Sequence, residues 1–321
     1  MNTLPSGNGE SSLTRDPGQD WISNTRTDHN MSNTIHGHSN RNVGNMSNFY
    51  NNTINVGVSE ESGRIQAWLS PLEPHARHQD VRNRRLDGVG DWVLQRNEFE
   101  SWSKSQDSAV NRTLLCYGDQ GAGKTYIRYK NIFQRPLRML TRNQISSLVI
   151  DTLCKQARGQ NIAVLSLYCD YQVQKDQSAV NMIGSLLSQI ALGGVGNVDE
   201  IQNVFEESRK GGGKGLRLPE MRELFVKTIS SCDRVYICVD AMDELAPQHR
   251  SELLRTLRHI IQEASNTGLF LTGRPHIRTE LDKHLTKGAY TIHIVPDQGD
   301  IARYLSRKME EADDRDPGLM T

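Results

Sequence analysis

The sequence predicts an α/β fold of three layers, in which helices cover both faces of a five-stranded, mainly parallel sheet. Five short apolar runs lack the alternation of polar residues that marks a strand with one solvated face. Amphipathic helical patterns separate these runs, as crossover connections between parallel strands require. The first run ends in a glycine-rich loop, and the five runs are residues 112–118, 162–171, 234–244, 269–275 and 290–295.

Two of the intervening segments carry a helical stripe of apolar residues. Residues 178–190 form the first, and residues 251–264 form the second, for which Ser251 is the predicted N-cap. The glycine-rich stretch 211–215 has neither a preceding strand nor a following Ser or Thr, so we expect a loop there. The stripes are Met182, Ile183, Leu186, Leu187 and Ile190, and Leu253, Leu254, Leu257, Ile260 and Ile261.

Composition limits the partners and the compartment. The 321 residues include 38 basic and 38 acidic side chains, so net charge gives no reason to expect a nucleic-acid or membrane partner. No apolar run approaches the roughly 18 residues of a membrane span, and no secretory signal opens the sequence. Five cysteines without a repeated spacing predict reduced thiols, and Cys116, Cys169 and Cys238 lie in apolar runs. We therefore expect a cytoplasmic protein.

Four regions differ in composition. Residues 1–62 are rich in Asn and Ser, and we expect this tail to be disordered. Its Asn-rich part, residues 35–57, is either a solvated tail or a segment that stacks as a cross-β ladder. Residues 63–110 predict short helices, with Trp68, Trp92 and Trp102 as packing anchors. The sheet domain covers residues 111–296, and residues 297–321 begin a further helical region.

The first motif is GDQGAGKT, which follows a predicted strand and fits the phosphate-loop pattern G-x-x-x-x-G-K-[ST]. Glycines allow backbone N–H groups to surround phosphate oxygens, and the following helix N-terminus adds positive potential. Lys124 would contact the β- and γ-phosphates, and the Thr125 hydroxyl would bind Mg²⁺. The predicted fold is thus a three-layer P-loop NTPase whose loop consists of Gly118, Asp119, Gln120, Gly121, Ala122, Gly123, Lys124 and Thr125.

Acidic residues follow another predicted strand, in the sequence VYICVDAMDEL. Asp240 ends the apolar run, where its carboxylate would reach the Mg²⁺ shell. Asp243 and Glu244 follow one turn later, where a carboxylate could orient or activate the attacking water. Acidic residues also start helices as partners of the helix dipole, but that role explains one carboxylate rather than three.

Arg274 lies just past the strand predicted at LFLTGRP. Ligands of open α/β sheets bind at the carboxyl ends of the strands, so Arg274 could sense the γ-phosphate. A lone arginine in a loop is more often a solvated surface residue. Its position after the two preceding motifs favours the functional interpretation.

These motifs resemble, in their order, those of the NACHT-type signal-transduction ATPases, and especially of fungal proteins similar to NOD-like immune receptors. The motifs are GDQGAGKT, LSLYCDYQ, VDAMDEL and LTGRP, and the small residue Ala241 also fits. Residues 68–81 and 88–102 resemble the segment that precedes the nucleotide domain in that family. The resemblance extends from about Trp68 to the C-terminus.

The resemblance implies an ATP/ADP-dependent switch that hydrolyses ATP slowly with Mg²⁺, in signalling like that of innate immunity or programmed cell death. GTP is a further candidate nucleotide. It implies that Lys124 and Thr125 contact phosphate and Mg²⁺, that Asp240 binds Mg²⁺, that Asp243 and Glu244 serve hydrolysis, and that Arg274 is the sensor. It also implies a homo-oligomer, with the tail as an effector or amyloid-like contact.

Two other classes of function stay open. One is an AAA+-like ATPase with rapid turnover, and the other is a non-catalytic fragment. Relatives continue into a helical region, a winged-helix domain and usually repeats. This sequence ends just inside the expected helical region, so we expect the lid and the repeats to be absent.

A basic stretch interrupts the helix that should follow the phosphate loop. Without residues 127–144 the sequence reads GKTYISSLVIDTLCKQA, with Ile145, Leu148, Val149 and Leu153 as one apolar stripe. With them, Pro136 breaks the helix. We interpret the stretch as an unspliced short intron read in frame; the alternatives are a genuine loop and an anion-binding basic arm, with the basic residues Arg128, Lys130, Arg135, Arg138 and Arg142.

Overall fold

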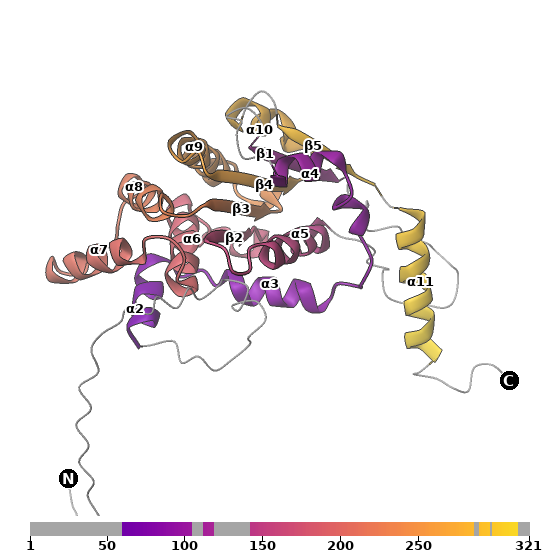
Figure 1. Cartoon of the computed structure of the whole chain (residues 1–321), viewed down its shortest axis with the longest axis horizontal. Coiled ribbons are helices and arrows are strands. Elements are labelled where there is room, and N and C mark those ends of the chain that lie inside the picture. Colours follow the sequence, from indigo (N-terminus) through magenta and orange to yellow (C-terminus); the bar gives the residue numbers. More distant parts are fainter. Residues whose placement is uncertain (1–59, 105–111, 119–141, 286–288, 296, 314–321) are drawn as a thin grey trace, which may run out of the picture. The chain divides into compact units, whose positions relative to one another are not determined.

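One sheet of five parallel strands forms the centre of the fold, in the order β2-β3-β4-β1-β5 (Figure 1). The structure is a computed structural model that describes residues 60–104, 112–118, 142–285, 289–295 and 297–313. The predicted α/β fold with a five-stranded parallel sheet is confirmed. The strands are β1 (Thr113–Gly118), β2 (Ile162–Tyr168), β3 (Arg234–Asp240), β4 (Thr267–Gly273) and β5 (Tyr290–Ile294).

Helices connect the strands and precede them. The helix α2 begins at Glu60, two residues before the predicted end of the tail. Residues 1–59, which include the Asn-rich tract, lie outside the described residues. The α-helices are α2 (Glu60–Leu69), α3 (Pro74–Asn83), α4 (Asn97–Lys104), α5 (Arg142–Gln156), α6 (Ala179–Gly193), α7 (Val198–Lys210), α8 (Leu218–Ile229), α9 (Pro247–Glu263), α10 (Arg278–Leu285) and α11 (Gln298–Asp313). Short 3₁₀ helices are η1 (Asp91–Val93), η2 (Tyr171–Val173), η3 (Met242–Glu244) and η4 (Pro275–Ile277).

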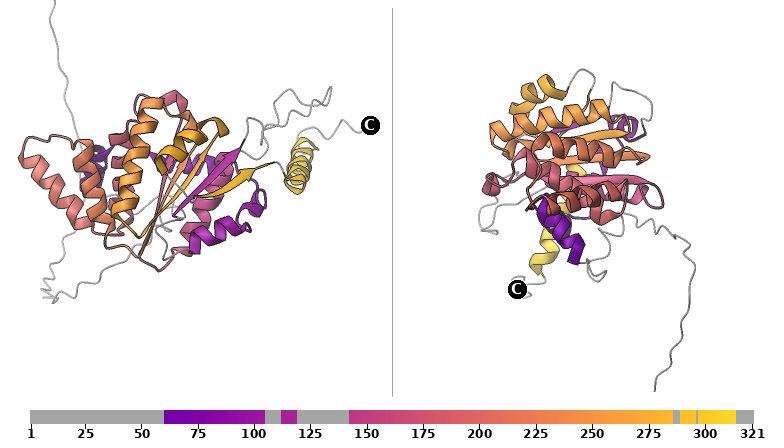
Figure 2. Two further views of the ribbon diagram at one scale, coloured as in Figure 1. Left: turned by 90° about the horizontal axis from the view of Figure 1, so that it is seen from above. Right: turned by 90° about the vertical axis from the view of Figure 1, so that its left-hand side faces the viewer.

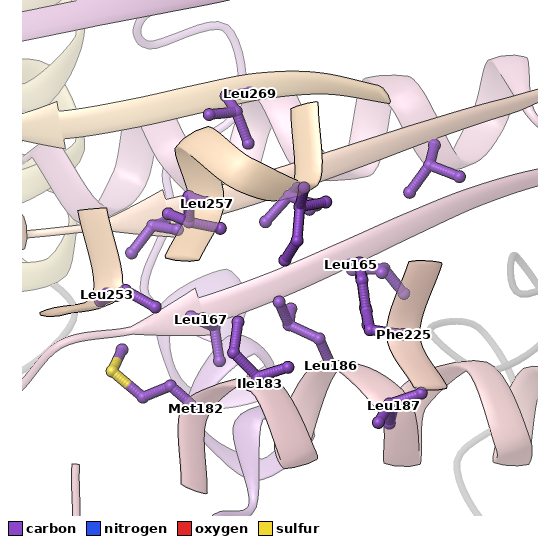
Figure 3. Close-up of a cluster of buried hydrophobic side chains, with 14 of the residues drawn as sticks. Leu165, Leu167, Met182, Ile183, Leu186, Leu187, Phe225, Leu253, Leu257 and Leu269 are labelled. Carbon is purple, nitrogen blue, oxygen red and sulfur yellow. The ribbon is translucent and has the colours of Figure 1, made fainter. Parts of the chain in front are cut away.

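Both faces of the sheet are buried, which explains why the strands are apolar throughout. Successive residues of β2 belong to different clusters: Leu165 packs with α6, α8 and α9, whereas Val164 packs on the side of α3 and α5. Figures 1 and 2 show helices on both sides of the sheet. Figure 3 shows the first cluster, in which Leu186, Phe225 and Leu257 approach the strands from three helices.

Two helix starts test the predicted stripes. All five stripe residues of α6 are buried, and the Ser178 hydroxyl caps that helix by accepting from the Asn181 backbone N–H at 3.3 Å. The predicted N-cap Ser251 is wrong, because α9 begins four residues earlier at Pro247. Proline suits the first helical turn, since its fixed φ is helical and it lacks an N–H. The Ser251 hydroxyl instead donates to Glu280 Oε1 at 2.8 Å.

The three predicted tryptophan anchors pack as expected. Trp102 is fully buried beside Tyr236 and Phe270. Trp68 meets the Phe205 ring edge to face at 5.3 Å between centroids, and Trp92 donates its indole N–H to Asp300. The predicted burial of the cysteines is also confirmed, because Cys116, Cys169 and Cys238 are all buried as free thiols.

Within the described residues, no helix alone is long and apolar enough to span a bilayer. The helices α6 and α7 meet that length and composition test only as a pair, and they are bent by 118°. Most of α6 is buried in the cluster of Figure 3, which accounts for its apolar composition.

Candidate functional site

The carboxyl ends of three neighbouring strands bring the predicted site residues to one edge of the sheet. The strand β4 lies between β1 and β3, and its register pairs Tyr117 with Gly273 and Val239 with Leu271. Gly118, Asp240 and Arg274 are each within one or two residues of those pairs, so they end adjacent strands at the same edge. Residues 119–125 of the predicted phosphate loop lie outside the described residues.

Asp240 is buried at this edge, with 1% of its surface exposed. Its Oδ1 accepts a hydrogen bond from the Ser146 hydroxyl of α5 at 2.5 Å and another from the Thr272 hydroxyl of β4 at 2.6 Å. Hydroxyl groups carry no charge, so these two bonds orient the carboxylate without neutralising it. Neither hydroxyl was predicted from the sequence; the signal for Thr272 is its place two residues before Arg274, at the end of the neighbouring strand.

The chain turns sharply after Asp240. Ala241 has a φ of 57° and is the only described residue other than glycine in the left-handed region. That conformation costs about 1–2 kcal/mol for a residue with a Cβ. The Ala241 backbone N–H donates to Thr272 Oγ1 at 2.9 Å, and the residue is fully buried. A small residue is needed here, and the turn delivers Asp243 and Glu244 back to the strand ends in η3.

Asp243 and Arg274 form an ion pair across the ends of β3 and β4. Arg274 Nε lies 2.9 Å from Asp243 Oδ2, and the Arg274 backbone N–H donates to Asp243 Oδ1 at 3.1 Å. The Asp243 side chain is 2% exposed and the Arg274 side chain 31% exposed. Arg274 is therefore held in place rather than solvated freely.

Glu244 is half-buried, and its backbone is fixed on both sides. Its N–H donates to Ala241 O at 2.8 Å, and its carbonyl accepts from Gln174 Nε2 at 2.6 Å. Gln174 follows η2, which continues the LSLYCDYQ segment after β2. The ends of the motif strands β1, β3 and β4 and the segment that follows β2 thus meet at one edge of the sheet.

Cys169 also lies at this edge, where its backbone N–H donates to Asp240 O at 3.0 Å. Burial, and next the charge of Asp240, raises the pKa of the Cys169 thiol well above its ordinary value. The thiol therefore stays protonated, which agrees with its predicted role as a buried apolar group.

The sequence of this edge matches a known family. Residues 88–135 and 142–274, more than half of the 321 residues, match the family described as Nephrocystin 3, N-terminal. The chain belongs to this family. The match includes the phosphate-loop motif, Asp240 and Arg274, and its gap at residues 136–141 lies within the basic stretch. The recognition of a NACHT-related P-loop ATPase is thereby confirmed, whereas the immune-receptor and fungal assignments stay predictions.

Solved structures of low sequence identity are similar to parts of this chain. The Walker-type ATPase paby2304 of Pyrococcus abyssi is 14% identical over 71% of this chain and 60% of its own, with a TM-score of 0.43. A chain of Drosophila ORC bound to DNA is 12% identical over 75% and 51%, with a TM-score of 0.45. The Aeropyrum pernix ORC1 protein in complex with DNA is 18% identical over 77% and 53%, at 0.38.

The chain therefore spans between half and three-fifths of the length of these solved structures. The sequence has no match among curated proteins. The family match and the strand order establish a NACHT-related P-loop NTPase.

A second buried carboxylate of this family member, Asp151, lies on α5 and faces α3. Its Oδ2 contacts Arg85 Nη2 at 2.7 Å, and its Oδ1 contacts His78 Nε2 at 3.1 Å. The other His78 nitrogen lies 2.6 Å from the Tyr168 hydroxyl, and Arg85 Nη1 donates to Ser147 Oγ at 3.0 Å. Burial alone would raise the pKa of Asp151, but the His78 hydrogen bond and the Arg85 charge hold it below its ordinary value.

The described residues at this edge could supply one carboxylate to a Mg²⁺ ion whose other ligands come from phosphate and water. Among the described residues, no group of three His, Cys, Asp or Glu side chains could hold a metal ion on its own. Mg²⁺ usually takes one or two protein carboxylates and completes its shell with phosphate and water. Asp240 fits that role, while the predicted ligand Thr125 lies outside the described residues.

Proposed function

We propose that the chain is an ATP/ADP-dependent switch in which Mg²⁺-bound nucleotide occupies the carboxyl edge of the sheet. The observation that carries the proposal is the orientation of the Asp240 carboxylate by hydroxyls from α5 and β4. The strand β4 lies between β3, which ends at Asp240, and β1, which leads into the phosphate loop. Mg²⁺ would supply charge neutralisation to the phosphates, and Asp240 with Thr125 would hold it. Lys124 and the loop amides would grip the phosphates.

The position of Ser146 supports this assignment through helical register. In a chain without residues 127–144, Thr125 would stand three positions before Ser146 on the same helix. Residues three apart share a helix face, so the Thr125 hydroxyl would lie on the face that meets Asp240. In the chain as it stands, α5 begins at Arg142, and Asn143 occupies that position. In the sequence, residues 127–144 thus stand between the phosphate loop and the apolar stripe of the helix that should follow the loop directly.

The structure describes the C-terminal part of that helix. Ile145, Val149 and Leu153 are fully buried, as the stripe predicts, whereas Leu148 is half-buried and Ile150, outside the predicted stripe, is buried. Residues 127–141 lie outside the described residues, so the interpretation of 127–144 as a retained intron stays a proposal. The mature transcript decides it: dominant reads that include the stretch would reject the intron.

The experiment that tests nucleotide binding compares four proteins: the chain, the chain lacking residues 127–144, and Lys124→Ala in each. Thermal unfolding is followed with Mg·ATP, Mg·ADP and no nucleotide. Binding to the native state raises Tm, because only the folded protein has the site. We expect a shift that Lys124→Ala removes, and a larger shift without the basic stretch. Equal Tm under all conditions in both lengths would reject nucleotide binding.

Turnover separates the switch from the AAA+-like alternative. A switch holds ADP or ATP for long periods and should hydrolyse ATP at close to a single slow turnover, whereas a motor turns over many times faster. We further propose that ATP promotes homo-oligomerisation, that the N-terminal tail contacts an effector or stacks when clustered, and that the protein acts in the cytoplasm. A sedimentation experiment with each nucleotide tests the oligomer.

A further inference from the structure

The ion pair between Asp243 and Arg274 uses both oxygens of the carboxylate. One oxygen contacts the side chain of Arg274 and the other accepts from its backbone N–H. The Asp243 side chain is 2% exposed, so solvent does not compete for it. A carboxylate that activates water must present an oxygen to that water, and this pair leaves Asp243 poorly placed to do so.

The same pair uses only one donor of the Arg274 side chain. A guanidinium has five N–H donors in a planar fork, and Nε is the one that contacts Asp243. Within the described residues Arg274 forms no other side-chain hydrogen bond or ion pair. With its Nε fixed, the guanidinium plane is held at the strand ends while its outer nitrogens remain for an anionic ligand.

Backbone turns restrict the positions of both residues of the Asp243–Arg274 ion pair. Pro275 begins η4 directly after Arg274, and the Ile277 N–H donates to Arg274 O at 3.2 Å. On the other side, the strained Ala241 fixes the start of η3, which carries Asp243. Both partners of the ion pair are thus attached to turns that leave little freedom.

We propose that Asp243 is a positioning residue that fixes Arg274 as the reader of the terminal phosphate, and that Glu244 is the carboxylate for hydrolysis. This inference rests on the proposed nucleotide site and divides two roles between neighbouring acidic residues. Arg274 would then distinguish ATP from ADP, because only ATP places a phosphate at the end of its reach.

The test measures the affinities for ATP and ADP, with Mg²⁺, by competition against a fluorescent nucleotide. We expect Asp243→Asn and Arg274→Gln each to reduce the ratio of ATP to ADP affinity about tenfold. The double variant should match either single variant, since both remove one interaction. Glu244→Gln should keep the affinity ratio and slow turnover by about tenfold or more. Asp282→Asn is the matched control, because the exposed Asp282 carboxylate lies 3.7 Å from Arg278 Nε. It should change neither the affinity ratio nor the turnover.

Arg274→Lys keeps the proposal testable if Asp243→Asn folds poorly. Lysine retains the charge but lacks the planar fork, so the affinity ratio should fall as in Arg274→Gln. A preserved ratio in Arg274→Lys and Arg274→Gln would overturn the inference, as would additive effects of Asp243→Asn and Arg274→Gln. If Asp243→Asn lost turnover but kept the ratio of ATP to ADP affinity, Asp243 would be the carboxylate that activates the attacking water, and the inference would be overturned. Those results leave nucleotide binding intact; a parent that binds neither nucleotide in either length overturns both proposals.

Discussion

Two buried aspartates, Asp240 and Asp151, are held by opposite kinds of group. Two hydroxyls bind Asp240 Oδ1, whereas Asp151 contacts Arg85 at 2.7 Å, Arg82 at 3.6 Å and His78 at 3.1 Å. Arginine neutralises a carboxylate within the protein, while a hydroxyl only orients it. The difference indicates that Asp151 stabilises the contact of α3 with α5, whereas the Asp240 carboxylate is oriented by the two hydroxyls for the role proposed above.

The two regions also differ in what the surrounding chain supplies. The groups around Asp151 come from the helical segment before the sheet, on α3 and just beyond it. The groups around Asp240 come from the sheet edge and from the first turns of α5. The same isosteric substitution, Asp to Asn, therefore tests stability at position 151 and ligand binding at position 240.

The largest expected effect is the loss of stability in Asp151→Asn. The amide can still accept from His78, but the Arg85 guanidinium, 14% exposed, loses its counter-charge. We expect the free energy of unfolding to fall by about 2 kcal/mol or more, measured by urea denaturation. Asp80→Asn, at an exposed pair with Arg84, is the control and should cost about 0.5 kcal/mol or less. An equally small effect of Asp151→Asn would remove the proposed distinction between the two aspartates.

Asp240→Asn should affect ligand binding more than folding. An amide oxygen can still accept from Ser146 and Thr272, so we expect the free energy of unfolding to change by about 1 kcal/mol or less. The Mg²⁺-dependent part of ATP affinity should fall about tenfold, because a neutral amide is a weaker ligand for a hard cation. Titration of ATP with Mg²⁺ and with EDTA measures this part directly. Unchanged Mg²⁺ dependence would mean that Asp240 is structural, like Asp151.

A pH dependence should mark the α3 side of the molecule. Burial, and next the charge of His78, lowers the pKa of His75 from 6.5 to about 4. Between these values the unfolded chain binds a proton that the folded chain excludes, so His75 makes stability fall as pH falls from 6.5 toward 4. His75→Gln should flatten Tm across that window. The depressed pKa of Asp151 acts only at lower pH, where its protonation removes stability. Parallel Tm profiles of parent and variant would show that His75 is solvated.

The smallest expected effect concerns the turn after Asp240. Glycine adopts a φ of 57° without the cost that Ala241 carries, but it also has more freedom in the unfolded chain. We expect Ala241→Gly to raise the free energy of unfolding by about 1 kcal/mol at most, measured by thermal unfolding. Ala241→Val should lower it, because the side chain is branched and the site is fully buried. A stabilised valine variant would contradict the strained turn.

The sequence predicted the strands and the motif edge because both depend on local pattern. Continuous apolar runs identified all five strands, and the motif order placed Asp240 and Arg274 at strand ends. The N-cap of α9 was wrong because a proline four residues upstream offered an earlier helix start than Ser251. Local preferences for the two caps compete, and the sequence alone does not weigh them.

The polar partners of the buried acids could not be predicted, because they are distant in sequence. Ser146 is 94 residues from Asp240, and His78 is 73 residues from Asp151. One signal was present: Asp151 lies beside Ile150 and Val149 on an otherwise buried stretch of α5, and a buried carboxylate needs a cationic or hydrogen-bonding partner. The sequence pattern therefore predicts that Asp151 has a polar partner, but it does not predict which residue that partner is.

Ser146 and Ser147 are consecutive on α5, and each serves a different aspartate. The first donates to Asp240 at the sheet, while the second accepts from Arg85, which also contacts Asp151. Successive helical residues point about 100° apart, so the two hydroxyls look in different directions from one short piece of backbone. Any rotation of α5 about its axis would disturb both contacts together, so α5 couples the helical segment before the sheet to the carboxyl edge of the sheet.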